Sequence, residues 1–176
     1  AYLKCINPQC GLEYSIENTN VQCEKGHLLD VKYKNKPSPK LKEVFYKRRN
    51  SEGSIFNESG VWRFRELLNF CQIDTENIEE CSKYLVSLDG AEGRQSKPYH
   101  MSKAADFIGI SNDNLWLQPE GYNPSGSFKD NGMATAVTHA KMVGAKKIVC
   151  ASTGNTSASA GMFAANEGIN CDVYIP

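Results

Sequence analysis

Several features that would place a protein at a membrane or on nucleic acid are missing from these 176 residues. No run of about 18 apolar residues occurs, so the sequence predicts no transmembrane helix. Twenty lysines and arginines balance twenty acidic residues, which argues against a basic surface for nucleic acid or anionic lipid. Residues 1–5 lack the apolar region of a signal peptide, so the cytoplasm is the expected location.

Two common phosphate-binding motifs are missing as well. Neither Gly-x-x-x-x-Gly-Lys-Ser/Thr nor Gly-x-Gly-x-x-Gly occurs, which disfavours P-loop and dinucleotide-binding proteins. What the chain does have is an ordinary globular composition, with 40% hydrophobic and 23% charged residues, together with seven cysteines. In a cytosolic protein such cysteines are more often metal ligands or buried thiols than disulfides.

Three segments of different composition follow one another. Residues 1–34 are rich in cysteine and in turn-forming residues, and they predict a small module of their own. Residues 35–98 are interpreted as a linker followed by a segment of mixed character. The linker, residues 35–43, has two prolines and three lysines. Residues 99–176 predict the first part of an α/β domain.

The middle segment gives two structural expectations. Residues 83–88 predict a strand, because they are mostly apolar and are followed by a turn-forming Asp-Gly pair. Trp62 is interpreted as an anchor of the core, and Arg63 and Arg65 beside it are interpreted as surface charges; the alternative is that the three form a binding patch.

The last part of the chain predicts alternating helices and strands. A helix with apolar positions three to four residues apart follows Phe128 and ends at Gly144. The other predicted elements are a helix after residue 98, strands over 114–118, 147–151 and 171–175, and a helix over 157–167. This order contains a βαβ unit, so the fold class is α/β with a parallel sheet. Because a buried parallel strand needs neighbours, we expect the chain to be the N-terminal part of a longer protein.

A single lysine stands at the start of the predicted helix. Residues 119–130 place Lys129 after a loop with two glycines, which allow close approach of the backbone to a ligand. The positive end of the helix dipole and partial burial beside Phe128 disfavour the ammonium form and favour a nucleophilic amine. The alternative is a solvated lysine beside Asp130 in an ordinary helix start.

A polar loop occupies the equivalent position before the next helix. Residues 152–157, with the sequence Ser-Thr-Gly-Asn-Thr-Ser, follow an apolar strand at the end where parallel sheets bind ligands. Hydroxyl groups, one amide and the N–H groups of the helix start suit a carboxylate or a phosphate. The alternative is an ordinary N-terminal cap, for which the same residue types are preferred.

Together the two loops resemble those of the threonine synthases, within the fold-type II pyridoxal-phosphate enzymes. Residues 120–133 resemble the lysine loop of that family, and residues 152–160 resemble its substrate loop. Residues 59–65 are similar to a patch found upstream in archaeal and plant-like members. The resemblance covers nearly all of the chain and implies the N-terminal portion of the fold-type II architecture, preceded by a zinc-ribbon-like module.

The resemblance implies particular roles. Lys129 would bind pyridoxal 5′-phosphate covalently and then move protons, while Asn155 would hydrogen-bond the cofactor's 3′ oxygen and Phe128 would pack near its ring. The residues implied to hold the substrate are Ser152, Thr153, Gly154 and Thr156. The implied activity is that of a carbon–oxygen lyase acting on phosphate, which converts O-phosphohomoserine and water to L-threonine and phosphate, the last step of threonine biosynthesis. The candidate assembly is a homodimer.

Three departures from the family pattern stand out. The family usually has Glu-Gly-x-Thr-Pro before the lysine loop, whereas Glu92-Gly93 is followed here by Arg-Gln-Ser-Lys-Pro. Asn131 stands where members often have arginine. The glycine-rich loop that holds the cofactor phosphate lies later in the family, beyond Pro176. These 176 residues by themselves are therefore expected to bind the cofactor poorly and to have no activity.

The cysteines near the start have the spacing of a metal site. Cys5-x4-Cys10 and Cys23-x3-His27 form two close pairs separated by twelve residues, which suits zinc with three thiolates and one imidazole. Threonine synthases often have an N-terminal ribbon with two Cys-x2-Cys pairs, which agrees with this placement although both spacings are longer here. The alternative is a metal-free ribbon with reduced thiols.

Other residues of these types predict structural roles. Cys150 and Cys171 are expected to be small buried hydrophobic residues, and His139 a packed or capping residue on its helix.

Two other functions compete with threonine synthase. One is another fold-type II lyase, such as a threonine dehydratase or a β-replacement synthase, against which residues 123–130 argue. The other is a zinc-ribbon binding module on a non-catalytic α/β domain, against which the neutral charge and the intact lysine loop argue.

Overall fold

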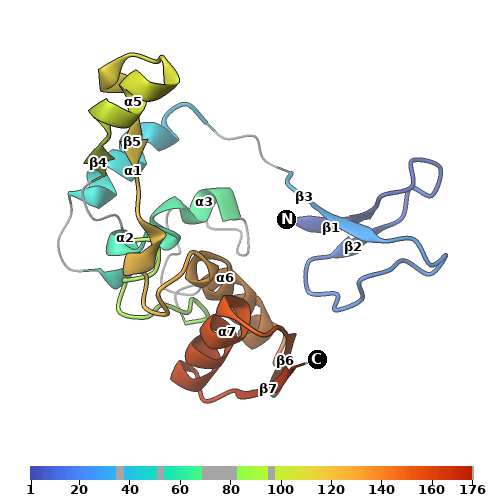
Figure 1. Ribbon diagram of the computed structural model, residues 1–176. Coiled ribbons are helices and arrows are strands. Elements are labelled where there is room, and N and C mark those ends of the chain that lie inside the picture. Colours follow the sequence, from blue (N-terminus) through green and yellow to red (C-terminus); the bar gives the residue numbers. More distant parts are fainter. Residues whose placement is uncertain (35–37, 51–53, 69–82, 95–97, 176) are drawn as a thin grey trace.

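The structure, a computed structural model, describes residues 1–34, 38–50, 54–68, 83–94 and 98–175 (Figure 1). In the first half of the chain the elements are β1 (Tyr2–Cys5), β2 (Glu13–Ser15), β3 (Leu29–Lys32), α1 (Leu41–Arg49), α2 (Ile55–Glu58), η1 (Trp62–Phe64) and α3 (Arg65–Leu68). In the second half they are β4 (Tyr99–His100), α5 (Ser102–Ile108), η2 (Asn112–Asn114), β5 (Trp116–Leu117), η3 (Glu120–Tyr122), α6 (Lys129–Met142), β6 (Lys147–Ala151), α7 (Asn155–Asn166) and β7 (Asn170–Tyr174).

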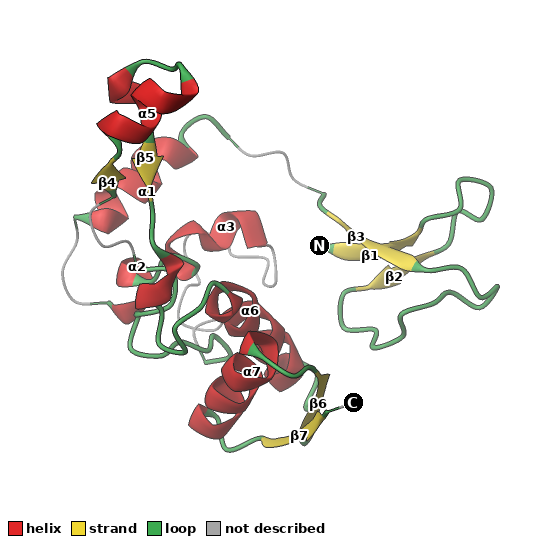
Figure 2. Ribbon diagram, in the orientation of Figure 1, coloured by secondary structure: helices red, strands yellow, loops and turns green. Residues whose placement is uncertain are grey.

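Residues 1–34, which we call the cysteine module, form an antiparallel sheet with the strand order β2-β1-β3 (Figure 2). Leu3 at the centre of β1 lies opposite Tyr14 on one side and Val31 on the other. Only Cys5 and Cys23 are buried in the module. A sheet this small has no apolar core of its own. Its boundary and its zinc-ribbon character stay predictions.

The core of the molecule lies between residues of the middle segment, 35–98, and the helices α6 and α7. Trp62 is 1% exposed, and its indole Nε1 donates a hydrogen bond to the carbonyl oxygen of Val86 at 2.7 Å. The buried side chains of this core are Val61, Trp62, Leu85, Val86, Ala134, Val137 and Phe163. The interpretation of Trp62 as a core anchor is confirmed.

The interpretation of Arg63 and Arg65 as surface charges is wrong, because each is only 6% exposed. Arg65 donates from Nη1 to the carbonyl oxygen of Trp62 at 2.9 Å and to Asn57 Oδ1 at 3.2 Å. The guanidinium of Arg63 lies over the ring of Phe64, 5.2 Å from its centroid. Burial lowers the pKa of both arginines. Their long side chains therefore cover the core beside Trp62 and do not extend into solvent.

The strand predicted over residues 83–88 is also wrong. The backbone groups that a strand would give to a neighbour bind side chains here: the Val86 N–H donates to Thr138 Oγ1 at 2.9 Å, and its carbonyl accepts from Trp62. The Leu88 N–H donates to Glu92 Oε2 at 2.9 Å. These side chains satisfy an irregular segment that remains buried.

The helix expected after residue 98 is confirmed as α5, and the strand expected over 114–118 is confirmed in the shorter form β5, which pairs antiparallel with β4. Of the described residues of α5, only Ala105 is buried. Phe107, although apolar, is 92% exposed.

The predicted βαβ unit is present as β6, α7 and β7, with the two strands parallel and Ile148 opposite Cys171. The α/β class is thus confirmed. The strands are less buried than expected: Val149 is 61% exposed, and Cys150 and Cys171 are half-buried. The reason is that, in the part of the chain that the structure describes, the sheet has two strands and α7 packs against them (Figure 1).

Helix α6 also contacts the cysteine module. His139 Nε2 lies 2.8 Å from the carbonyl oxygen of Ile16, in the loop that follows β2. His139 is half-buried, as its interpretation as a packed residue requires. Among the described residues, no helix has both the length and the hydropathy needed to cross a bilayer.

Candidate functional site

Lys129 is the first residue of α6, and its amine lies against an aromatic ring. The Nζ atom is 4.4 Å from the centroid of the Phe128 ring. Lys129 is half-buried, whereas Phe128 is 57% exposed. The backbone N–H of Lys129 donates to Ser127 Oγ at 3.2 Å, which fixes the start of the helix. The predicted proximity of the amine to Phe128 is therefore present.

The loop before Lys129 is held in shape by the buried side chain of Asn123. Its Oδ1 accepts from the N–H of Gly93 at 2.9 Å, and its Nδ2 donates to the carbonyl of Ser127 at 2.9 Å and to Glu120 Oε2 at 2.8 Å. Gly126 has a φ of 79°, a left-handed conformation that favours glycine, and closes a turn onto Asn123. The loop is thus pre-shaped by its own polar groups.

Asp130 joins the lysine loop to α7. This carboxylate is fully buried, and it accepts from the N–H of Ser125 at 2.7 Å, from the hydroxyl of Ser125 and from Ser159 Oγ at 2.6 Å. Asp130 is the second residue of α6 and Ser159 is the fifth residue of α7. Because a hydrogen bond joins them, the N-terminal parts of these helices lie side by side. The sequence alone did not single out Ser159 as the partner of Asp130. A signal existed, since Ser159 is the only hydroxyl in the small and apolar run 158–165.

The polar loop before α7 is closed by Ser157. Its hydroxyl lies 2.7 Å from the carbonyl oxygen of Ser152 and 2.9 Å from that of Gly154. Helix α7 begins after Gly154 without a side-chain cap. Thr153, Gly154 and Asn155 are exposed, and Ser152 and Thr156 are half-buried. The start of a 12-residue helix and its neighbouring hydroxyls therefore remain accessible to an anionic ligand.

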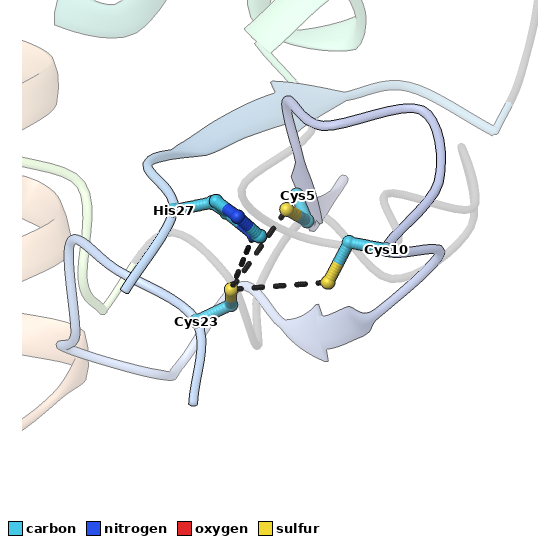
Figure 3. A group of neighbouring side chains, drawn as sticks. All are labelled: Cys5, Cys10, Cys23 and His27. Carbon is cyan, nitrogen blue, oxygen red and sulfur yellow. Dashed lines mark hydrogen bonds between the residues drawn. The ribbon is translucent and has the colours of Figure 1, made fainter. Parts of the chain in front are cut away.

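A second cluster lies in the cysteine module, where the four residues selected by spacing come together (Figure 3). The ligand atoms of Cys5, Cys10, Cys23 and His27 all lie within 4.8 Å of one another. Cys23 Sγ is 3.8 Å from Cys5 Sγ, 3.9 Å from Cys10 Sγ and 3.6 Å from His27 Nδ1.

The thiol of Cys23 has an environment that favours the thiolate. Burial raises its pKa, but hydrogen bonds from the backbone N–H groups of His27 and Lys25 and from the side chains of Cys5 and His27 lower it to about 7. Burial raises the pKa of Cys5, and the backbone N–H of Asn7 acts in the opposite direction. A thiolate is the form that binds a metal ion.

Comparison with known proteins identifies the relatives of this chain. Residues 98–176 match the family model described as pyridoxal-phosphate dependent enzyme. The threonine synthase of Methanocaldococcus jannaschii is 33% identical over 174 residues, which are 98% of this chain and 37% of the relative. That of Methanosarcina acetivorans is 35% identical over 176 residues, 99% of this chain and 37% of the relative.

A more local match has higher identity. The threonine synthase of Mycobacterium leprae is 60% identical over 62 residues, 35% of this chain and 17% of the relative. The chain thus spans little more than a third of the length of the first two relatives, 37% in each case. Residues 98–176 thus match the pyridoxal-phosphate-dependent enzymes, and the resemblance of the chain to the threonine synthases is confirmed.

Proposed function

We propose that this chain provides the lysine and the carboxylate-binding loop of a threonine synthase, which converts O-phosphohomoserine and water to L-threonine and phosphate. The observation that carries the proposal is the link from Asp130 to Ser159, because it keeps the helix start with Lys129 beside the helix start with Asn155. The threonine synthase relatives support this choice of reaction over that of other lyases.

The residues present fit pyridoxal phosphate. Lys129 offers a half-buried amine, the group that condenses with the aldehyde of the cofactor, and Phe128 places an aromatic ring beside it. The exposed amide of Asn155 can donate to an oxygen on the cofactor ring. When bound, the cofactor supplies the electron sink that stabilises carbanions of the substrate.

The side chains of the chain then have distinct tasks. Lys129 holds the cofactor and moves protons at its Nζ atom. The hydroxyls of Ser152, Thr153 and Thr156 and the N–H groups that follow Gly154 orient the substrate carboxylate. No charged side chain occurs between Ile148 and Asn166, so dipoles and hydrogen bonds neutralise that carboxylate.

The test compares Lys129→Ala with the unchanged intact protein. We expect the variant to lose the visible absorbance of bound cofactor and to release phosphate from O-phosphohomoserine about 10²–10⁴-fold more slowly. Lys141→Ala, at the other end of the same helix, is the matched control and should keep both signals. Absorbance that is unchanged in Lys129→Ala would refute the assignment of this lysine. Deamination of threonine without phosphate release from O-phosphohomoserine would instead indicate a dehydratase.

We also propose that Cys5, Cys10, Cys23 and His27 bind one zinc ion. With Zn–S bonds of about 2.3 Å and Zn–N bonds of about 2.0 Å, a tetrahedral site separates its sulfurs by about 3.8 Å and a sulfur from the nitrogen by about 3.5 Å. The separations from Cys23 are 3.8 and 3.9 Å to the sulfurs and 3.6 Å to the nitrogen, which supports the proposal. Metal analysis of protein purified without oxygen should find one zinc per chain, and Cys23→Ser should lose it while Cys171→Ser retains it.

A further inference from the structure

Asn7 contacts three of the four residues of the cysteine cluster. Its side-chain Nδ2 lies 3.2 Å from His27 Nε2. Its backbone N–H donates to Cys5 Sγ at 3.4 Å, and its carbonyl oxygen accepts from the N–H of Cys10 at 3.0 Å. The last contact closes a turn that the four-residue spacing between Cys5 and Cys10 accommodates.

We infer that Asn7 is a positioning residue that presents Nδ1 of His27, and not Nε2, to the metal ion. The inference rests on the proposed zinc site. Nδ1 is the ring nitrogen on the side of Cys23 Sγ, at 3.6 Å, whereas Nε2 is occupied by Asn7. In metal sites the ring nitrogen that binds the metal is set by the hydrogen bond that the other nitrogen makes.

The side-chain amide of Asn7 can form a hydrogen bond with Nε2 of His27 in two orientations. As placed, Nδ2 points to Nε2, and Oδ1 accepts from the N–H of Gln9 at 3.0 Å. Rotated by 180°, the amide presents Oδ1 to Nε2 and accepts a hydrogen bond from the Nε2–H group. A neutral imidazole that binds zinc through Nδ1 has its proton on Nε2, so the zinc-bound protein requires the second orientation. In that orientation the N–H of Gln9 loses its acceptor, and because Gln9 is exposed, water can replace it.

The position of Asn7 also explains why this contact orients the ring. The backbone of the same residue is hydrogen-bonded to Cys5 Sγ and to the N–H of Cys10, so the side chain starts from a fixed position beside His27 and only its own χ angles can move the amide. A hydrogen bond from a mobile loop would not impose this restraint. Outer-shell partners of metal-bound histidines contribute about 10–100-fold to metal affinity.

The test uses the intact protein, zinc or cobalt as the metal, and three variants. Asn7→Leu keeps the branched shape of the side chain and removes both ends of the amide, whereas Asn7→Asp retains an acceptor for Nε2. Asn18→Leu is the matched control in the same module, because the Oδ1 of Asn18 accepts from the backbone of Asn20 at 2.7 Å and belongs to a different turn.

Two measurements decide the matter. The ¹⁵N shifts of the His27 ring in the zinc-loaded protein should show Nδ1 bound to metal and Nε2 protonated. Competition with a chelator should show that Asn7→Leu binds zinc about 10–100-fold more weakly, while Asn7→Asp and Asn18→Leu stay close to the unchanged protein.

The outcomes separate this inference from the zinc site on which it rests. A ring that binds through Nε2, or an Asn7→Leu variant with unchanged affinity, would overturn the role of Asn7 and leave the zinc site intact. Failure of the unchanged protein to bind zinc would overturn both.

Discussion

The cysteine module and the pair of helices α6 and α7 are stabilised by opposite means. In the module the two buried side chains are Cys5 and Cys23, and Val21 and Val31 are exposed. In the helix pair Val137 is 1% exposed and Phe163 is fully buried. The module therefore lacks the apolar burial that stabilises a fold, whereas the helix pair has it.

Polar groups also differ between the two regions. The buried carboxylate of Asp130 in the helix pair accepts hydrogen bonds from Ser125 and Ser159. The buried sulfurs of the module face one another and His27. Such an arrangement is satisfied by a cation at its centre. The proposed zinc would hold the cysteine cluster together, whereas the chain itself organises the site between α6 and α7.

Removal of the proposed zinc should produce the largest difference in stability between the cysteine module and the helix pair. Structural zinc contributes about 10–16 kcal/mol to the folding of small zinc modules at neutral pH. We expect a chelator, or Cys23→Ser, to abolish hydrogen-exchange protection of the amides in β1 and β3 and to leave the amides of α6 and α7 protected. Cys171→Ser, at a half-buried cysteine in β7, is the control and should leave β1 protected. Protection of β1 that survives chelation would show that the module is stable without a metal.

A smaller effect should follow from Asp130→Ala. The substitution leaves the N–H of Ser125 and the buried hydroxyl of Ser159 without their acceptor, at a cost of about 1–3 kcal/mol for each unsatisfied group. We expect a lower free energy of unfolding in urea and weaker cofactor absorbance, with the module unaffected. Asp106→Ala, at an exposed position of α5, should change neither. Equal unfolding energies for the two variants would mean that the link between α6 and α7 carries no stability.

The elements that were predicted correctly are those whose boundaries are marked by residues close in the sequence. The helix after Phe128 ends before Gly144, whose φ of 72° is the left-handed conformation that ends helices. The order of β6, α7 and β7 follows from apolar runs separated by polar or glycine-containing loops. The start of α7 is two residues earlier than the predicted 157, because Gly154 serves as its N-terminal cap. The spacing of cysteines likewise selected the four residues that the structure gathers.

The features that sequence did not predict depend on distant partners. Residues 83–88 have the composition of a strand, but the N–H of Val86 binds Thr138, 52 positions away. Arg63 and Arg65 alternate with apolar residues like surface charges, yet both are buried beside Trp62. The bond between Asp130 and Ser159 joins two helices that a single sequence cannot place side by side.

The smallest expected effect concerns the contact between the two regions. His139 Nε2 lies 2.8 Å from the carbonyl of Ile16, so His139→Leu removes one hydrogen bond between α6 and the module, worth about 0.5–1.5 kcal/mol. We expect the amides of residues 16–20 to exchange up to about tenfold faster, since each 1.4 kcal/mol is about a factor of ten. The amides around Cys23 should keep their rates, because the proposed metal site holds them independently of α6. His100→Leu, in β4, is the control and should leave residues 16–20 unchanged. If exchange around Cys23 also accelerates in His139→Leu, the cluster depends on its contact with the helix, and the two regions are coupled more tightly than their separate stabilisation implies.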